Sequence, residues 1–398
     1  MREIVFSLLA GACFAASAGA ANPAEKQVIQ ADEVWRPIDM SALSVQPGSA
    51  LDLSGIHEPG PAGKYGRVTI GPDGSFRFEK QPEKPVRFFA FNAFANHVMS
   101  LKESMLKVGS KEETHKNIRE FAAKVRRQGY NMVRFQGVDL LLMSGKDAPG
   151  RAQFSPSNLD CFQYLLHCLK QEGVYFGIDL FSYTGYEKFN HQWYDAIAKR
   201  YKERMYFDPE ARQMWLDGVK ALMTGKNPYT GLTLNEEPAL IYVDMHNEQE
   251  LGIWIKKEPL NDPEIKPLAE AAWRTFLKKR YGGDIGRLSR SWKENFASFD
   301  AVPLFVKKNL QEWGAKGKDA NDFLYGVERE MLEFYRKGLK EIGCRTYATL
   351  YDVLGYFRFT SIRRDVPVIT AHGYHNHPTA NNNPGSRMDQ NSLVCNAA

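Results

Sequence analysis

The chain has 398 residues, enough for roughly two or three average domains or for one large α/β barrel with additions. Hydrophobic residues make up 43% and charged residues 25%, as in ordinary globular proteins, so the chain can bury a large core. The net charge of +5 comes from 52 basic and 47 acidic residues spread along the chain. So small an imbalance gives no reason to expect nucleic acid as a partner.

The start of the chain has the composition of a secretory signal. Arg2 precedes an apolar run over residues 4–16, and small residues up to Ala20 suit a signal peptidase. We therefore expect residues 1–20 to be a signal peptide cleaved near Ala20, and the mature protein to be secreted or periplasmic. Lipidation at Cys13 is a disfavoured alternative. No later apolar run is long enough to span a bilayer, so no membrane partner is expected after cleavage.

Residues 27–86 are rich in Gly, Pro and Ser and contain short alternating stretches. Two of these stretches, residues 66–70 and 75–78, flank the sequence Gly-Pro-Asp-Gly. An Asp-Gly turn between alternating runs favours a β-hairpin. We predict a small N-terminal β region over residues 27–86.

From residue 87 predicted strands and helices alternate, which favours a parallel sheet. Helices are expected to begin at Thr114, Ser157 and Asp208, among others. The predicted strands cover residues 87–92, 131–135, 174–180, 239–243, 345–350 and 366–370.

The fold class that this pattern predicts is α/β, of the (β/α)8 TIM-barrel type. A doubly wound sheet is less favoured because the Gly-x-Gly-x-x-Gly turn of a dinucleotide site is absent from the sequence. Only twenty residues follow Pro378, so about six of eight strands fit. We expect an incomplete barrel over residues 87–378 and a polar tail or truncation point at residues 379–398.

Polar residues follow several predicted strands at the point where each strand ends, where parallel α/β folds place their chemistry. The run over residues 239–243 leads into Asp244, His246, Asn247 and Glu248. A capping Asn and a solvated Glu would give the same pattern. Arg134 and Asp179 stand at the ends of earlier strands.

These strand ends resemble those of clan A of the retaining (β/α)8 glycoside hydrolases, most of all family five, the cellulase and mannanase type. The resemblance covers roughly residues 85–378. It is carried by Arg134 in Met-Val-Arg-Phe, by the Asn247-Glu248 pair, and by His372 and Tyr374 in a His-x-Tyr element.

The resemblance implies a secreted enzyme that hydrolyses O-glycosidic bonds in β-linked glycans with retention, needing two carboxyl groups about 5 Å apart. Glu248 would be the acid/base, its pKa raised by partial burial and a neighbouring carboxylate. Asn247 would bind a sugar hydroxyl, and Arg134 would keep the nucleophile ionised, with Tyr374 orienting it. Further substrate-binding candidates are Asp179, His246 and His372.

The expected partner is therefore an oligosaccharide or polysaccharide, with no cofactor and no metal. The spacing of His372, His375 and His377 suggests zinc as a minor alternative. Loop histidines beside a sugar cleft are the favoured interpretation.

The connection over residues 183–207 is too long for a plain loop and is expected to be partly helical. Its aromatic residues could stack on sugar faces or equally form helix core. They are Tyr183, Tyr186, Phe189, Trp193 and Tyr194.

One difference from the clan outweighs these matches. The clan's nucleophile is a Glu at the end of strand seven, whereas the last Glu here is Glu341, before the fifth predicted strand. We therefore expect either a C-terminally truncated enzyme or an inactive relative. The alternative function is a non-catalytic carbohydrate-binding protein on a degenerate glycosidase barrel.

Overall fold

The computed structural model describes most of the chain after residue 43. The described residues are 44–99, 106–107, 109–144, 147–186, 194–248, 251, 263–350 and 357–372. The expected signal peptide at residues 1–20, with Cys13, and the expected tail at residues 379–398 lie outside them.

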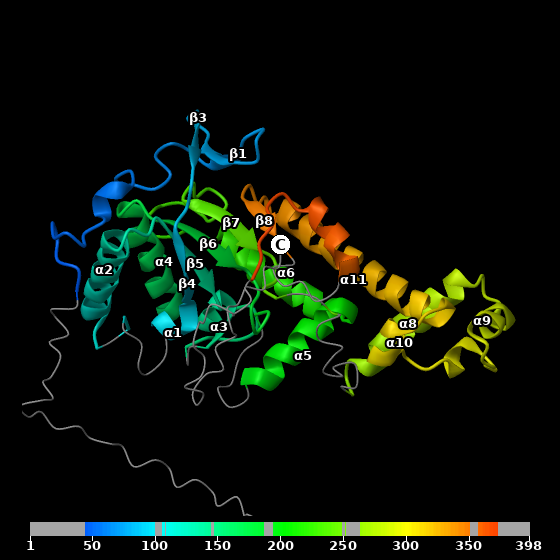
Figure 1. Cartoon of the computed structure of the whole chain (residues 1–398). Helices are drawn as coiled ribbons and strands as arrows, with labels where there is room; N and C mark the ends of the chain where they lie inside the picture. The colour runs from blue at the N-terminus through cyan, green and yellow to red at the C-terminus, as the bar shows by residue number, and fades with distance from the viewer. Residues whose placement is uncertain are drawn as a thin grey trace, which may run out of the picture. The chain divides into compact units, whose positions relative to one another are not determined.

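Three short strands form an antiparallel sheet in the order β1-β2-β3 (Figure 1). They are β1 (Val68–Ile70), β2 (Phe76–Phe78) and β3 (Gln81–Val86), preceded by a 3₁₀ turn, η1 (Ser54–Ile56). The hairpin between β1 and β2 closes with a hydrogen bond of 2.8 Å from the Gly71 amide to the Ser75 carbonyl. Gly74 takes a positive φ of 78°, which explains the glycine of the Asp-Gly pair. The predicted hairpin is confirmed.

The main sheet contains five parallel strands, and neighbours in sequence are neighbours in space (Figure 1). This β4-β5-β6-β7-β8 order is that of a barrel wall, whereas a doubly wound sheet would reverse direction at a switch point. The sheet does not close within the described part of the chain. The strands are β4 (Ala90–Phe94), β5 (Met132–Gln136), β6 (Tyr175–Asp179), β7 (Leu240–Asp244) and β8 (Tyr347–Thr349).

The sixth predicted strand, over residues 366–370, is wrong. The 3₁₀ helix η4 (Phe357–Asp365) leads into an irregular segment that reaches residue 372. Pro367 has no amide hydrogen for a sheet ladder, and Ile369 is 60% exposed, so the run lacks a second buried face. The β-branched residues gave a strand signal that the tertiary structure does not follow.

The outer face of the main sheet packs on helices through fully buried residues such as Val133, Phe135 and Ile178. The rings of Phe135 and Phe162 meet edge to face at 5.4 Å, which ties β5 to α4. The helices that follow successive strands are α2 (Lys111–Arg127), α4 (Pro156–Gln171), α6 (Pro209–Thr224) and α11 (Ala315–Ile342). Shorter or connecting helices are α1 (Ala95–Met99), α3 (Val138–Met143) and α5 (Tyr194–Phe207).

Two predicted helix starts need correction. Helix α2 begins after Ser110, four residues before Thr114, because Ser110 and Glu113 form a reciprocal capping box. Helix α4 is capped by Ser155, with Pro156 as its first residue, and not by Ser157. The predicted cap at Asp208 is confirmed, since its carboxylate accepts the Glu210 amide hydrogen at 2.9 Å.

Residues 263–313 add helices beside the start of α11. They are α8 (Lys266–Arg280), α9 (Ile285–Trp292), η3 (Phe299–Ala301) and α10 (Lys307–Gln311). Their shared core is aromatic, with the ring of Trp273 within 5.2 Å of the rings of Phe305 and Phe323. Within the described ranges, none of the helices is both long and apolar enough to cross a bilayer.

Candidate functional site

The middle of β5 and the ends of β6 and β7 bring one arginine and two aspartates together. Arg134 binds Asp179 through two parallel hydrogen bonds, Nε to Oδ1 at 3.0 Å and Nη2 to Oδ2 at 2.8 Å. The same Nη2 lies 3.6 Å from Oδ2 of Asp244. Asp179 and Asp244 are register partners at the last positions of β6 and β7, so their side chains share the inner face of the sheet.

Burial makes these charges depend on each other. The side chains of Asp179 and Asp244 are 0% and 1% exposed, and that of Arg134 is 17% exposed. Burial lowers the pKa of Arg134, but the carboxylates of Asp179 and Asp244 outweigh this and leave it raised. Removing Arg134 would leave two buried carboxylates without their cation, a large cost in a dry environment.

Asn247 connects this cluster to the segment after β7. Its Oδ1 accepts a hydrogen bond of 2.9 Å from Nη2 of Arg134. Its backbone amide donates to the Phe181 carbonyl at 2.8 Å, and its carbonyl accepts from Nζ of Lys202 at 2.7 Å. Asn247 is only 2% exposed, so in this structure it holds the loop and Arg134 in place.

His372 lies between Arg134 and Glu248 and is within hydrogen-bond distance of both. These two contacts determine which ring nitrogen of His372 carries the hydrogen. Nη1 of Arg134 lies 2.7 Å from Nε2 of His372, and Nδ1 of His372 lies 3.1 Å from Oε1 of Glu248. A guanidinium can only donate, so Nε2 must be the accepting nitrogen. We therefore assign the hydrogen of the neutral ring to Nδ1, from which it is donated to Glu248.

Glu248 is the most exposed carboxylate of this group, at 35% of its side chain. Its backbone has a positive φ of 51°, a left-handed conformation that costs a non-glycine residue about 1–2 kcal/mol. Such backbone strain persists only where the surrounding contacts hold the residue in that conformation, and strained residues are common at functional sites. Here the bonds that fix Asn247 direct the chain into this turn.

Five residues singled out in the sequence meet in this cluster: Arg134, Asp179, Asn247, Glu248 and His372. Arg134 binds the buried Asp179, and its expected role in keeping a nucleophile ionised stays a prediction. Tyr374, His375 and His377 lie outside the described residues. In the part of the chain that is described, no three His, Cys, Asp or Glu side chains are grouped so that they could hold a metal ion.

His246 lies in the core and not at the cluster. It is 0% exposed, stacks on Phe181 at 4.2 Å, and its Nδ1 lies 2.9 Å from the hydroxyl of Tyr335. A fully buried ring cannot reach a sugar in this conformation, so its expected substrate contact is replaced by a packing role.

Sequence reasoning missed two residues of the site. Asp244 carries the same signal as Asp179, a carboxylate at the end of a buried strand, and could have been assigned. Lys202 could not, because its partner is a backbone carbonyl 45 positions away and no pattern marks it.

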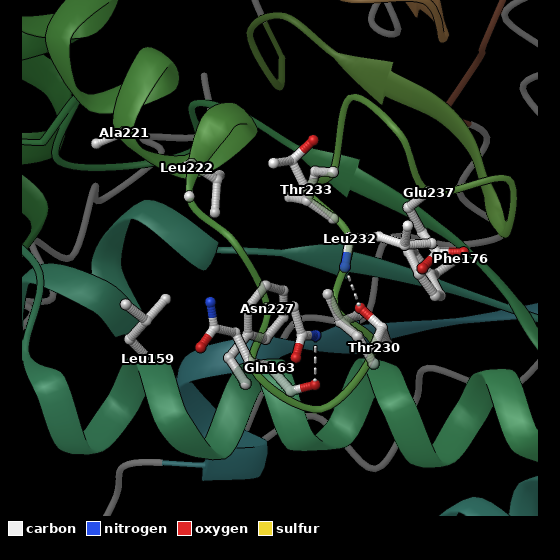
Figure 2. A pocket seen from close by; sticks show the side chains of 14 residues that line it. Leu159, Gln163, Phe176, Ala221, Leu222, Asn227, Thr230, Leu232, Thr233 and Glu237 are labelled. Atoms are coloured by element: carbon white, nitrogen blue, oxygen red, sulfur yellow. Dashed lines mark hydrogen bonds between the residues drawn. The ribbon is translucent and has the colours of Figure 1, made fainter.

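A small cavity on the opposite, helix-covered face of the sheet is separate from this site (Figure 2). It lies between α4, α6 and residues 225–237, with a volume of about 40 Å³, room for little more than water. Asn227 spans its wall by donating to the Gln163 carbonyl at 2.9 Å (Figure 2). It is too small for a sugar ring.

No protein-family model matches the chain. No curated protein matches it either. Among solved structures, a family 5 mannosidase from Rhizomucor miehei aligns at 14% identity with a TM-score of 0.34, covering 72% of each chain. A β-galactosidase from the psychrophilic Marinomonas ef1 aligns at 14% identity with a TM-score of 0.45, over 72% of this chain and 40% of its own.

An endo-1,4-β-mannanase from Rhizomucor miehei aligns at 16% identity with a TM-score of 0.33, over 48% of this chain. The chain spans 56% of the length of that mannanase. With TM-scores below 0.5, these likenesses assign no family, and the functional proposal has to come from the chemistry of the site.

Proposed function

We propose that the protein is a secreted glycoside hydrolase that cleaves O-glycosidic bonds in β-linked glycans with retention, and that Glu248 is its acid/base. The observation that carries the proposal is the orientation of Glu248. Its carboxylate is partly exposed at the carboxyl edge of a parallel sheet and is held by His372, whose tautomer Arg134 sets. The signal-like residues 1–20 support export.

The chemistry of this carboxylate suits proton transfer to a leaving group. A general acid must reach the glycosidic oxygen and must be oriented before the bond breaks. Glu248 is oriented by His372 and reaches the surface, whereas Asp179 and Asp244 are buried and bound to Arg134. Glu248 is therefore the carboxyl group of this cluster suited to meet a sugar.

The alternative is a non-catalytic carbohydrate-binding protein on the same scaffold. It is favoured by one observation: the two other carboxylates of the cluster, Asp179 and Asp244, are 0% and 1% exposed and cannot attack an anomeric carbon. A double displacement needs such a nucleophile. Tests of the proposal must therefore measure binding and turnover separately.

The test combines calorimetric titration against β-linked manno-, gluco- and galacto-oligosaccharides with hydrolysis of aryl β-glycosides. Under the enzyme proposal, Glu248→Gln loses about 10²–10⁴-fold in kcat/KM on a substrate whose leaving group needs a proton. It loses much less on a dinitrophenyl glycoside, whose leaving group needs none. Asp322→Asn, on α11 outside the cluster, is the control that keeps wild-type rates.

Each outcome decides between the two functions. Hydrolysis that depends on Glu248 in this leaving-group pattern supports the enzyme. Binding without hydrolysis by the wild-type chain supports the carbohydrate-binding protein. Failure to bind or hydrolyse any glycan of the panel overturns both.

A further inference from the structure

An aromatic pair stands at the same edge of the sheet as the Glu248 cluster. Phe94 is the last residue of β4 and Tyr183 follows β6, and their ring centroids lie 5.2 Å apart at an angle of 58°. Both residues are half-buried. Gly137, at the end of β5, has a positive φ of 72°, and a Cβ built there would lie 3.4–3.5 Å from both rings. The three strand ends thus converge on one spot.

The position of Tyr183 is fixed by an unusual use of a buried carboxylate. Oδ2 of Asp139 accepts the backbone amide hydrogens of Tyr183, Thr184 and Gly185 at 2.8, 2.7 and 3.2 Å. Asp139 is 0% exposed, and burying a carboxyl group costs free energy. The hydrogen bonds that Asp139 makes to this loop offset that cost. The hydroxyl of Ser182 also accepts the Gly137 amide hydrogen, at 3.0 Å.

Two amide side chains lie beside the aromatic pair on the inner face of the sheet. Nδ2 of Asn92 donates to Oε1 of Gln136 at 3.1 Å. In the register between β4 and β5, Phe94 pairs with Gln136 and Asn92 pairs with Arg134. Phe94 therefore lies beyond the level of Arg134 by two residues, which is about 7 Å along the strand. Rings, amides and the Glu248 cluster occupy one continuous edge.

This combination suits one kind of ligand. Aromatic faces pack against the C–H faces of a pyranose, and amide groups both donate to and accept from its hydroxyls. Ligand sites commonly combine apolar contact area with a few placed polar groups. The four side chains Phe94, Tyr183, Asn92 and Gln136 are uncharged, and the neighbouring Arg134 is neutralised by Asp179. Such a site favours a neutral sugar over a uronic acid.

We propose that Phe94, Tyr183, Asn92 and Gln136 form a subsite for one neutral pyranose unit of a glycan chain, next to the unit at Glu248. The proposal rests on the proposed function and adds where the chain continues and which chemical class of sugar it contains. Asp139 is a positioning residue that keeps Tyr183 in the subsite.

The experiment compares the affinity of wild type, Tyr183→Leu, Phe94→Leu and Gln136→Leu for a β-linked disaccharide and a tetrasaccharide of the sugar that the panel above identifies. We expect each variant to weaken tetrasaccharide binding by about tenfold, roughly 1.4 kcal/mol, and to change disaccharide binding much less. The matched control is Tyr164→Leu, which should bind as wild type does. Tyr164 has a half-buried ring on α4 that stacks on His115 of α2.

The outcomes separate this proposal from the proposed function. If wild type binds glycans and Glu248→Gln changes turnover while the three variants bind the tetrasaccharide normally, the subsite is wrong and the enzyme proposal stands. Tighter binding of a uronic-acid tetrasaccharide than of a neutral one overturns the sugar class. Should Tyr183→Leu fail to fold, Asn92→Ala at an exposed position gives the same readout, and unchanged affinity there overturns the subsite.

Discussion

His246 is held as a neutral histidine within the core. Burial lowers its pKa well below the usual value, and the nearby charge of Lys202 acts in the same direction. In the unfolded chain the same side chain takes up a proton near pH 6.5. The unfolded state therefore binds more protons below that pH, and acid favours unfolding.

The first prediction concerns the pH dependence of stability. As pH falls from about 6.5, His246 should reduce the free energy of unfolding by up to about 1.4 kcal/mol per pH unit. Replacing it in His246→Phe should remove that part of the slope, although the variant loses the bond to Tyr335 and is less stable at neutral pH. Urea unfolding between pH 5 and pH 8 measures both slopes, and identical slopes would contradict the assignment.

Gly218 is a second residue whose effect on stability can be predicted. Replacing it with alanine should lower the stability of the protein, although this change inside a helix usually raises it. Glycine to alanine inside a helix usually stabilises by about 0.5–1 kcal/mol. At Gly218 in α6, however, an added Cβ would lie 2.1 Å from Cγ of Tyr186, a ring that is fully buried. We expect Gly218→Ala to destabilise by about 1–3 kcal/mol through overpacking.

The matched control is Gly326→Ala in α11, where an added Cβ meets no atom within 4 Å. That variant should be stabilised or unchanged. Urea unfolding midpoints at pH 7 measure both, and a stable Gly218→Ala would mean that Tyr186 can move aside.

At the level of elements, the helices of residues 263–313 are joined to α11 by one carboxylate. Oδ2 of Asp319 accepts from Nε1 of Trp292 at 2.8 Å and from the hydroxyl of Tyr281 at 2.5 Å. Its other oxygen, Oδ1, pairs with Arg280. Asp319 is 1% exposed, so α8, α9 and α11 meet at a buried acceptor with three donors.

Asp319→Asn keeps the shape of this acceptor but turns one oxygen into a donor that faces other donors. We expect a loss of about 1–3 kcal/mol, because buried donors are left unsatisfied. The effect should be strongest around α8 and α9, and hydrogen exchange resolved by peptide would show it there first. Asp322→Asn, which removes a partly exposed partner of Arg280, should cost less than about 1 kcal/mol. Equal losses in the two variants would contradict the buried role of Asp319.

The elements that could be predicted are those whose signal is local. The buried strand at β7 and the Asp-Gly hairpin were visible because periodicity and turn chemistry act over a few residues. The same logic located Glu248 just after the end of β7, whereas Arg134 lies in the middle of β5 and not at its end. The failures depend on distant contacts, such as Lys202 on the Asn247 carbonyl.

His372 illustrates the difference most clearly. Its place at the site was predicted, but for the wrong reason, since a sixth strand was expected to carry it. The chain reaches the site through an irregular segment held by Arg329 on Asp365 and by the hydroxyl pair of Thr349 and Thr370 at 3.0 Å. No sequence pattern encodes such long-range side-chain bonds.

Across the whole chain, the small N-terminal sheet covers the amino-terminal ends of the main strands (Figure 1). The ring of Phe78 in β2 stacks on Tyr175 of β6 at 5.4 Å. Burial raises the pKa of Tyr175 to about 12, so its hydroxyl stays protonated, and it accepts the Gly63 amide hydrogen at 3.1 Å. The hydroxyl of Tyr347 in β8 accepts the Ile70 amide hydrogen at 3.1 Å. Both sheets therefore share contacts and should unfold together.

Arg67 is the side chain that joins the most distant parts of this arrangement. Its Nη2 donates to the Asn235 carbonyl at 2.5 Å, and its Nη1 lies 3.4 Å from both the Glu237 carbonyl and Oγ1 of Thr346. These acceptors precede β7 and β8, so one guanidinium connects the first sheet to two strands of the second. A lysine has a single point of donation and cannot reproduce this fork.

The last prediction follows from that geometry. Arg67→Met should lower the free energy of unfolding by about 1–3 kcal/mol within a single transition, since it leaves carbonyls without their donor, and Arg67→Lys should recover only part of the loss. Arg77→Met removes bonds to Asp73 and to the Pro82 carbonyl, all within the same small sheet, and should cost less than about 1 kcal/mol. Circular dichroism and tyrosine fluorescence followed through one urea titration measure these losses. If the two sheets form one cooperative unit, they should unfold at the same denaturant concentration. A separate early transition of the N-terminal sheet in Arg67→Met would mean that the two sheets are stabilised independently.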